Sequence, residues 1–119
     1  MRSVAVLLVA LLSTGLPSRS NAEEGVTTGE MMEHCQKPDG HFFKTYCFTY
    51  VAAVIDMQTL YALSDSSGPR VACIPPHVVA RQASAVFVQW ATQNPARQHI
   101  PAAAGIVESM VHAFPCSAP

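Results

Sequence analysis

The sequence has few charged residues and no apolar segment near its N-terminus that is long enough to cross a membrane. Asp, Glu, Lys and Arg make up 13% of its 119 residues, whereas an average soluble domain contains about 25%. The apolar run over residues 4–12 spans nine residues, and a membrane helix needs roughly 20. So little charge predicts a sizeable apolar surface, which favours binding to a protein partner or to a second copy of the chain.

The motifs of metal, catalytic and nucleic-acid chemistry are missing as well. The sequence contains four cysteines: Cys35, Cys47, Cys73 and Cys116. Their spacings of 12, 26 and 43 residues fit no zinc finger or ribbon, although His34 and His41 flank the first of them. No Gly-x-Ser-x-Gly nucleophile elbow occurs, and no basic cluster of the kind that binds nucleic acid. We therefore expect neither an enzyme nor a metal or cofactor site.

Residues 1–22 have the pattern of a secretory signal peptide. Arg2 supplies a positive charge, the apolar run follows, and the small residues Ser20 and Ala22 occupy the −3 and −1 positions of a cleavage site. No cysteine follows that site, so we expect no lipid anchor. The sequence predicts an exported domain over residues 23–119 that is free of the membrane after cleavage.

An exported domain of about 97 residues holds only one modest core and is marginal without cross-links. Its five basic residues against eight acidic ones give a formal net charge of −3 with His neutral. An even number of cysteines in an exported chain predicts disulfides rather than free thiols. Four cysteines allow three pairings, and the sequence alone does not choose among them.

Apolar periodicity predicts helices through most of residues 23–119. Thr27 and Glu30 form a capping-box pattern, with Val26 and Met31 as its hydrophobic staple. This first helix is expected to end near Cys35. A second is predicted over about residues 44–64, with the following side chains on its buried face: Cys47, Tyr50, Val51, Val54, Ile55 and Tyr61.

Two further helices are predicted in the second half of the chain. The third is expected to start at Pro75 and Pro76, because a missing amide donor costs nothing in a first turn, and to end at residues 94–95. Its predicted inner residues are Val79, Ala83, Val86, Phe87 and Trp90. The fourth is expected to start near residue 101, with these inner residues: Ala103, Ile106, Val107, Met110, Val111 and Phe114. The fold class is therefore an all-α, compact bundle of four or five helices.

The expected helix order suggests one disulfide pairing. In an up-and-down bundle, Cys35 ends the first helix where Cys47 opens the second, and Cys73 opens the third at the end where the fourth delivers Cys116. We therefore prefer the pairs Cys35–Cys47 and Cys73–Cys116, with the other pairings left open.

The chain contains an ordered series of short motifs: Cys47-x-x-Tyr50-Val51, Asp56, Cys73-Ile74-Pro75 with Gln82, Asn94-Pro95 with His99, Ala102-Ala103 and Phe114-Pro115-Cys116. This series resembles that of the Rap/Tai immunity proteins of type VI secretion systems. It covers about residues 29–116. Ala53 stands where the family usually has glycine, and Trp90 where it has tyrosine or a similar residue, both of which read as packing changes.

The resemblance implies a periplasmic inhibitor. Members of this family bind cell-wall amidase effectors and block their active-site clefts, commonly as dimers. A loop over residues 65–70 or the turn over residues 94–101 would then enter the cleft, held in shape by the disulfides. The candidate contact residues are Asp65, Ser66, Ser67, Gly68, Arg70, Arg97 and His99.

Several of the motif residues have a structural interpretation as well, and the chain has an alternative function. Cys73, Pro75, Pro115 and Cys116 read as bridge and helix-boundary residues. Tyr50 and Trp90 lie on apolar stripes and are expected in the core. Asp56 could cap, pair with a base or face solvent. The alternative function is a periplasmic acid-stress chaperone, for which low charge and five titratable His residues would be useful near pH 5–6.

Overall fold

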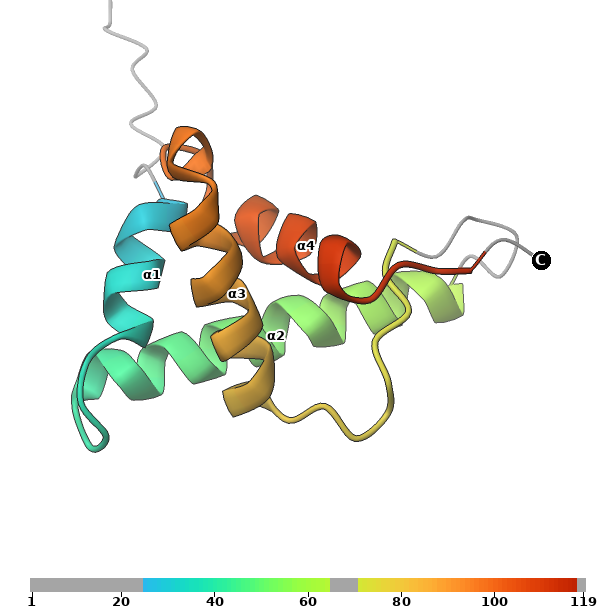
Figure 1. Ribbon diagram of the computed structural model, residues 1–119. Coiled ribbons are helices and arrows are strands. Elements are labelled where there is room, and N and C mark those ends of the chain that lie inside the picture. The colour runs from blue at the N-terminus through green and yellow to red at the C-terminus, as the bar shows by residue number, and fades with distance from the viewer. Residues whose placement is uncertain (1–24, 65–70, 118–119) are drawn as a thin grey trace, which may run out of the picture.

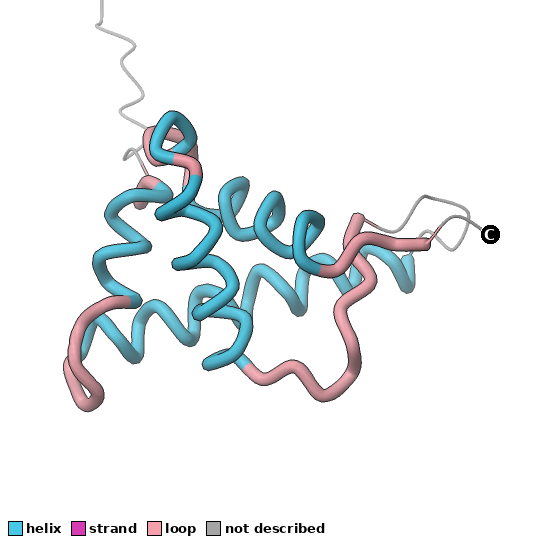
Figure 2. The backbone as a smooth tube through the Cα atoms, viewed as in Figure 1, coloured by secondary structure: helices cyan, strands magenta, loops and turns pink. Residues whose placement is uncertain are grey.

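The computed structural model describes residues 25–64 and 71–117. Their elements are α1 (Thr28–Cys35), α2 (Phe42–Ser64), α3 (Ala80–Gln93), a short 3-10 helix η1 (Pro95–Arg97) and α4 (Ala102–Ala113). Figure 1 shows α1 and α3 beside the N-terminal half of α2, and α4 lies against its second half. No strand occurs in these ranges beyond one antiparallel bridge between Thr27 and Pro101, and Figure 2 shows helices joined by loops. The predicted all-α bundle is confirmed.

The start of α1 has the predicted capping box. The Thr27 backbone amide donates to Glu30 Oε2 over 2.9 Å, and the Glu30 amide donates to Thr27 Oγ1 over 3.3 Å. The backbone and side-chain hydrogen bonds from Thr27 lower the pKa of Glu30, because they favour its ionised form. Val26 and Met31 both pack into the core, as expected of a staple.

Helix α2 begins two residues earlier than predicted. The carbonyl of His41 accepts the amides of Lys44 and Thr45 at 3.0 and 3.2 Å, and its Nδ1 accepts the amide of Phe43 at 3.2 Å. The prediction that Tyr61 faces the core is wrong, since its side chain is 71% exposed. Among the described elements, none covers that side of the last turns of α2.

Helix α3 starts at Ala80, so the prediction that Pro75 and Pro76 open it is wrong. These prolines precede the helix, and the carbonyl of Pro75 accepts the amide of Val78 in a turn. The Val79 amide donates instead to Gln82 Oε1 over 3.1 Å, which closes the first turn of α3. Val79 itself is 58% exposed and does not belong to the inner stripe, because its extended backbone lies outside the helix.

The inner residues predicted for α3 and α4 otherwise mostly face the core. Ala83, Phe87 and Trp90 are buried on α3, and Ile106 and Met110 on α4. The buried side of α4 also includes three small residues: Ala102, Gly105 and Ser109. The prediction for Val111 is wrong: it is exposed, because the helix turns these small residues toward α1 and α3.

Both preferred disulfides are present. Cys35–Cys47 joins the end of α1 to the second turn of α2. Cys73–Cys116 joins the segment after α2 to the segment after α4, and beside it the Cys73 amide donates to the Phe114 carbonyl over 2.9 Å. Each bridge therefore fixes one end of the bundle.

Candidate functional site

The second half of α2 exposes a large apolar surface. Four of its side chains are more than half exposed, as is one on the segment that leads to α3: Met57, Leu60, Tyr61, Leu63 and Val71. The four on α2 extend beyond one narrow face, whereas a helix on a protein surface normally turns a single apolar stripe toward the core. So many exposed apolar side chains on one helix favour a surface that a partner covers.

A groove continues this surface between α2 and α4. It has a volume of about 400 Å³, and its walls include Tyr50, Val54 and Met57 of α2 and Ala103 and Val107 of α4. Such a volume lies within the usual range of binding pockets, which are mostly apolar with a few polar groups.

One polar side chain lines this groove. Gln58 is a wall residue, and both the nitrogen and the oxygen of its amide are buried without a hydrogen-bond partner. Leaving such groups unpaired costs about 1–3 kcal/mol each.

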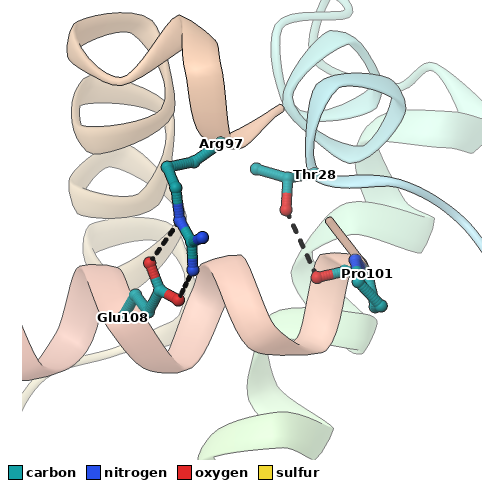
Figure 3. Close-up of polar contacts among 4 residues, drawn as sticks. All are labelled: Thr28, Arg97, Pro101 and Glu108. Atoms are coloured by element: carbon teal, nitrogen blue, oxygen red, sulfur yellow. Dashed lines mark hydrogen bonds and ion pairs between the residues drawn. The ribbon is translucent and has the colours of Figure 1, made fainter. Parts of the chain in front are cut away.

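The turn between α3 and α4 is held by the chain itself. The amides of Thr28 and Gly29 donate to the carbonyls of Ile100 and Gln98 over 2.8 and 2.9 Å, which satisfies two donors at the start of α1. Thr28 Oγ1 also donates to the Pro101 carbonyl over 3.3 Å (Figure 3). This turn is therefore anchored along its length.

The predicted contact residues of this turn differ in their surroundings. Both carboxylate oxygens of Glu108 accept hydrogen bonds from Arg97 (Figure 3). These hydrogen bonds, and to a smaller extent the charge of Glu108, raise the pKa of Arg97. His99 is exposed. The other candidates, Asp65, Ser66, Ser67, Gly68 and Arg70, lie outside the described residues.

The residues of the predicted structural motif are spread over the fold. Tyr50 is partly buried and lines the groove, Trp90 is in the core, and Asp56 is exposed on α2. Pro95 and Pro115 are exposed at helix boundaries, Pro75 is exposed in the segment before α3, and Phe114 packs partly buried against the core. Sequence reasoning missed the exposed apolar side chains of α2 and the unpaired Gln58. The available signal for the exposed side chains was that apolar residues flank the predicted buried face of α2 on both sides.

Residues 25–64 and 71–117 contain neither a metal site nor a membrane-spanning helix. No group of three or more His, Cys, Asp or Glu side chains there is placed to hold a metal ion. None of the helices in this part of the chain combines the length and the apolar character needed to cross a bilayer.

The fold and the groove define a class: a small helical domain, cross-linked by two disulfides, with an apolar surface on one long helix. A model of the Rap1a immunity proteins matches residues 27–116. The chain therefore belongs to the Rap1a immunity protein family. No curated protein and no solved structure shows a significant match to it.

Proposed function

We propose that this protein is a periplasmic immunity protein that binds a cell-wall amidase effector of a type VI secretion system and blocks its active site. The observation that carries the proposal is the family match over residues 27–116. The two disulfides agree with an exported protein, since disulfides persist in oxidising compartments. The protein acts by occupying a surface and performs no catalysis of its own.

The contact surface that the geometry favours is the second half of α2 with the adjoining groove. Interface centres are enriched in aromatic residues and Met, and Tyr61 and Met57 are exposed there. The bound effector would bury these two side chains. The loop over residues 65–70 lies outside the described residues and remains a candidate contact from the sequence alone.

The turn that carries Arg97 and His99 remains a second candidate contact. Its anchoring to α1 makes it preorganised, and a rigid element loses less entropy on binding than a mobile one. Replacing His99 by alanine tests this contact, because its side chain is exposed.

The central test measures inhibition of an amidase. Candidate effectors are assayed on purified peptidoglycan with increasing amounts of the protein. Tyr61→Gln should weaken inhibition at least tenfold, since aromatic residues at an interface centre often contribute 2 kcal/mol or more. Phe42→Gln is the matched control, because Phe42 is an exposed aromatic side chain, 73% accessible, at the other end of the same helix.

Two results would contradict the proposal. Absence of binding to every tested amidase, together with protection of a client protein from aggregation near pH 5, would favour the chaperone. If Tyr61→Gln and Phe42→Gln weaken inhibition equally, the second half of α2 is not the contact surface. A second copy of the chain could also cover the groove, so sedimentation with and without the amidase should accompany the assay.

A further inference from the structure

A second cavity lies at the N-terminal end of α2, away from the apolar groove. Its volume is about 390 Å³, and it is bounded by α2, α3 and the end of α1. Its walls include Lys44 and Phe48 of α2, Arg81 and Ser84 of α3, and Cys35 of the first disulfide. The immunity function proposed above does not use this cavity.

Two cationic side chains from different helices meet over one aromatic ring at this cavity. Lys44 Nζ lies 5.5 Å and Arg81 Cζ 5.3 Å from the centre of the Phe48 ring, within the distance at which a cation is attracted to a ring face. The side chain of Lys44 is only 21% exposed. Phe48 therefore holds both cationic groups at the same place.

The donors of both cations are largely unused. An ammonium group has three N–H donors and a guanidinium five. The one carboxylate near them within the described residues is that of Asp39, at 4.0 Å from Lys44 and 3.5 Å from Arg81. Its side chain is 70% exposed on the turn before α2. Neither distance is that of a strong hydrogen bond, so an incoming anion would find free donors.

Backbone charge adds to this positive region. Lys44 and Arg81 occupy the first turns of α2 and α3, and neither first turn contains an acidic residue. The N-terminus of a helix carries a partial positive charge of roughly half a unit, which favours anions and disfavours cations. Helix α1 shows the ordinary arrangement, with Glu30 in its first turn and His34 in its last. The helix ends therefore disfavour both cations, and the exposed carboxylate of Asp39 offsets this only in part.

A buried hydroxyl provides an independent sign of a ligand. Ser84 is 3% exposed, lines the same cavity, and has no hydrogen-bond partner for its Oγ. Buried polar groups are bonded in the great majority of cases, and each exception requires an explanation. A ligand atom in the cavity would supply the missing partner.

From this juxtaposition we propose that the cavity binds the carboxylate of an acidic side chain carried by a peptide segment of a protein partner. The carboxylate sits between Lys44 and Arg81, accepts their hydrogen bonds and displaces Asp39. The short aliphatic stem of the bound side chain packs on the ring of Phe48. Asp39 already places a carboxylate against both cations, which shows that this chemistry fits the site.

Peptide titrations followed by amide NMR test the site without any effector, so their outcome is separate from that of the amidase assay. The disulfide-bonded protein is titrated at low ionic strength with acetyl-Ala-Ala-Glu-Ala-Ala-amide and with the same peptide containing Gln. The Glu peptide should give saturable shifts at Lys44, Arg81 and Ser84, with at least tenfold tighter binding than the Gln peptide. Equal binding of the two peptides overturns the proposal.

Charge variants separate a specific site from general attraction. Lys44→Gln and Arg81→Gln should each weaken binding of the Glu peptide at least fivefold. Lys37→Gln is the matched control, because it removes the same charge from the exposed turn between α1 and α2 and does not line the cavity. Asp39→Asn should strengthen binding, since it removes a competing carboxylate. The proposal is overturned if Lys37→Gln and Lys44→Gln weaken binding of the Glu peptide equally. It is also overturned if sulfate causes the same NMR shifts as the Glu peptide, because both results would mean a general attraction between charges.

Discussion

At the scale of single residues, three buried hydroxyl groups differ in their hydrogen bonds. The difference distinguishes the hydroxyls that stabilise the fold from the one that a ligand would bind. Thr28 donates to Pro101, and Ser109 Oγ donates to the Ile106 carbonyl over 2.7 Å. Ser84 has no partner, although it is buried in the same core. The first two hydroxyls stabilise the fold, whereas that of Ser84 lowers its stability and remains available to a ligand.

Replacing Ser84 by alanine should stabilise the protein while it weakens binding of the acidic peptide. Removing a buried hydroxyl that lacks a partner should raise the free energy of unfolding by about 1 kcal/mol. Urea unfolding measures this change. Ser109→Ala is the control, and should lower the free energy of unfolding because it removes a bonded hydroxyl. Equal destabilisation by the two variants would show that the Ser84 hydroxyl is bonded after all.

The carboxylate of Glu30 makes the first helix sensitive to pH. The hydrogen bonds from Thr27 lower its pKa in the folded protein below the ordinary value of 4.5. A depressed pKa contributes stability that is present above the unfolded pKa and lost as pH falls through the folded one. Glu30→Gln should therefore be less stable than the native protein at pH 7, and the difference should shrink as pH falls through the folded pKa of Glu30. Thermal unfolding followed from neutral to acidic pH measures it.

A neighbouring carboxylate controls for general charge effects in this experiment. Glu33 is exposed on the same helix and lies outside the capping box. Glu33→Gln should leave the pH dependence close to that of the native protein. A difference between native protein and Glu30→Gln that persists unchanged at low pH would contradict the role given to the ionised carboxylate.

At the scale of elements, the sequence predicted features that depend on local chemistry. It did not predict which side chains of one helix are covered by the other helices. The capping box of Thr27 and the two disulfides follow from short-range patterns and helix order, and both are present. The exposure of Tyr61 depends on how far the other helices reach along α2, which periodicity does not encode. The prediction for the start of α3 was wrong because the side chain of Gln82 accepts the amide of Val79. This hydrogen bond places the first turn of the helix after the two prolines.

The candidate sites could be predicted only in outline. Low charge indicated a sizeable apolar surface, and exposed apolar side chains do gather on the second half of α2. The cavity that holds Lys44 and Arg81 could not be predicted, because these residues are 37 positions apart in sequence and meet through packing of α2 on α3. Likewise, no pattern marks Ser84 or Gln58 as unpaired, since pairing depends on the final positions of their neighbours.

The close approach of α1 to α4 depends on a glycine. A Cβ atom on Gly105 would lie 2.3 Å from Thr28 Oγ1 and 2.8 Å from Thr28 Cγ2. Alanine favours a helix over glycine by about 1 kcal/mol, but overpacking a core costs typically 1–3 kcal/mol. Gly105→Ala should therefore destabilise the protein, as measured by urea unfolding.

A double variant tests the cause of that loss. Thr28→Ala removes the two side-chain atoms that the new methyl group would meet most closely. Gly105→Ala should then destabilise the Thr28→Ala protein much less than it destabilises the native one. Simple addition of the two losses would place the clash elsewhere.

At the scale of the whole molecule, α2 connects two binding surfaces of different chemistry. Its N-terminal part contributes Lys44 and Phe48 to the cationic cavity, and its second half forms the apolar groove. Each surface lies beside one disulfide: Cys35 lines the cavity, and Val71, two residues before Cys73, lines the groove. The two cross-links therefore stabilise two different sites on a single helix.

Removing the disulfides one at a time should separate the two binding activities. Loop-closure entropy predicts a loss of about 3 kcal/mol for Cys35–Cys47 and about 4 kcal/mol for Cys73–Cys116, so both paired alanine variants are studied at low temperature with a stabilising osmolyte. Loss of Cys35–Cys47 should weaken acidic-peptide binding more than amidase inhibition, because it frees the α1 wall of the cavity. Loss of Cys73–Cys116 should have the opposite effect, because it frees the segment that carries Val71 into the groove. Equal weakening of both activities by each variant would mean that the disulfides support only the bundle as a whole.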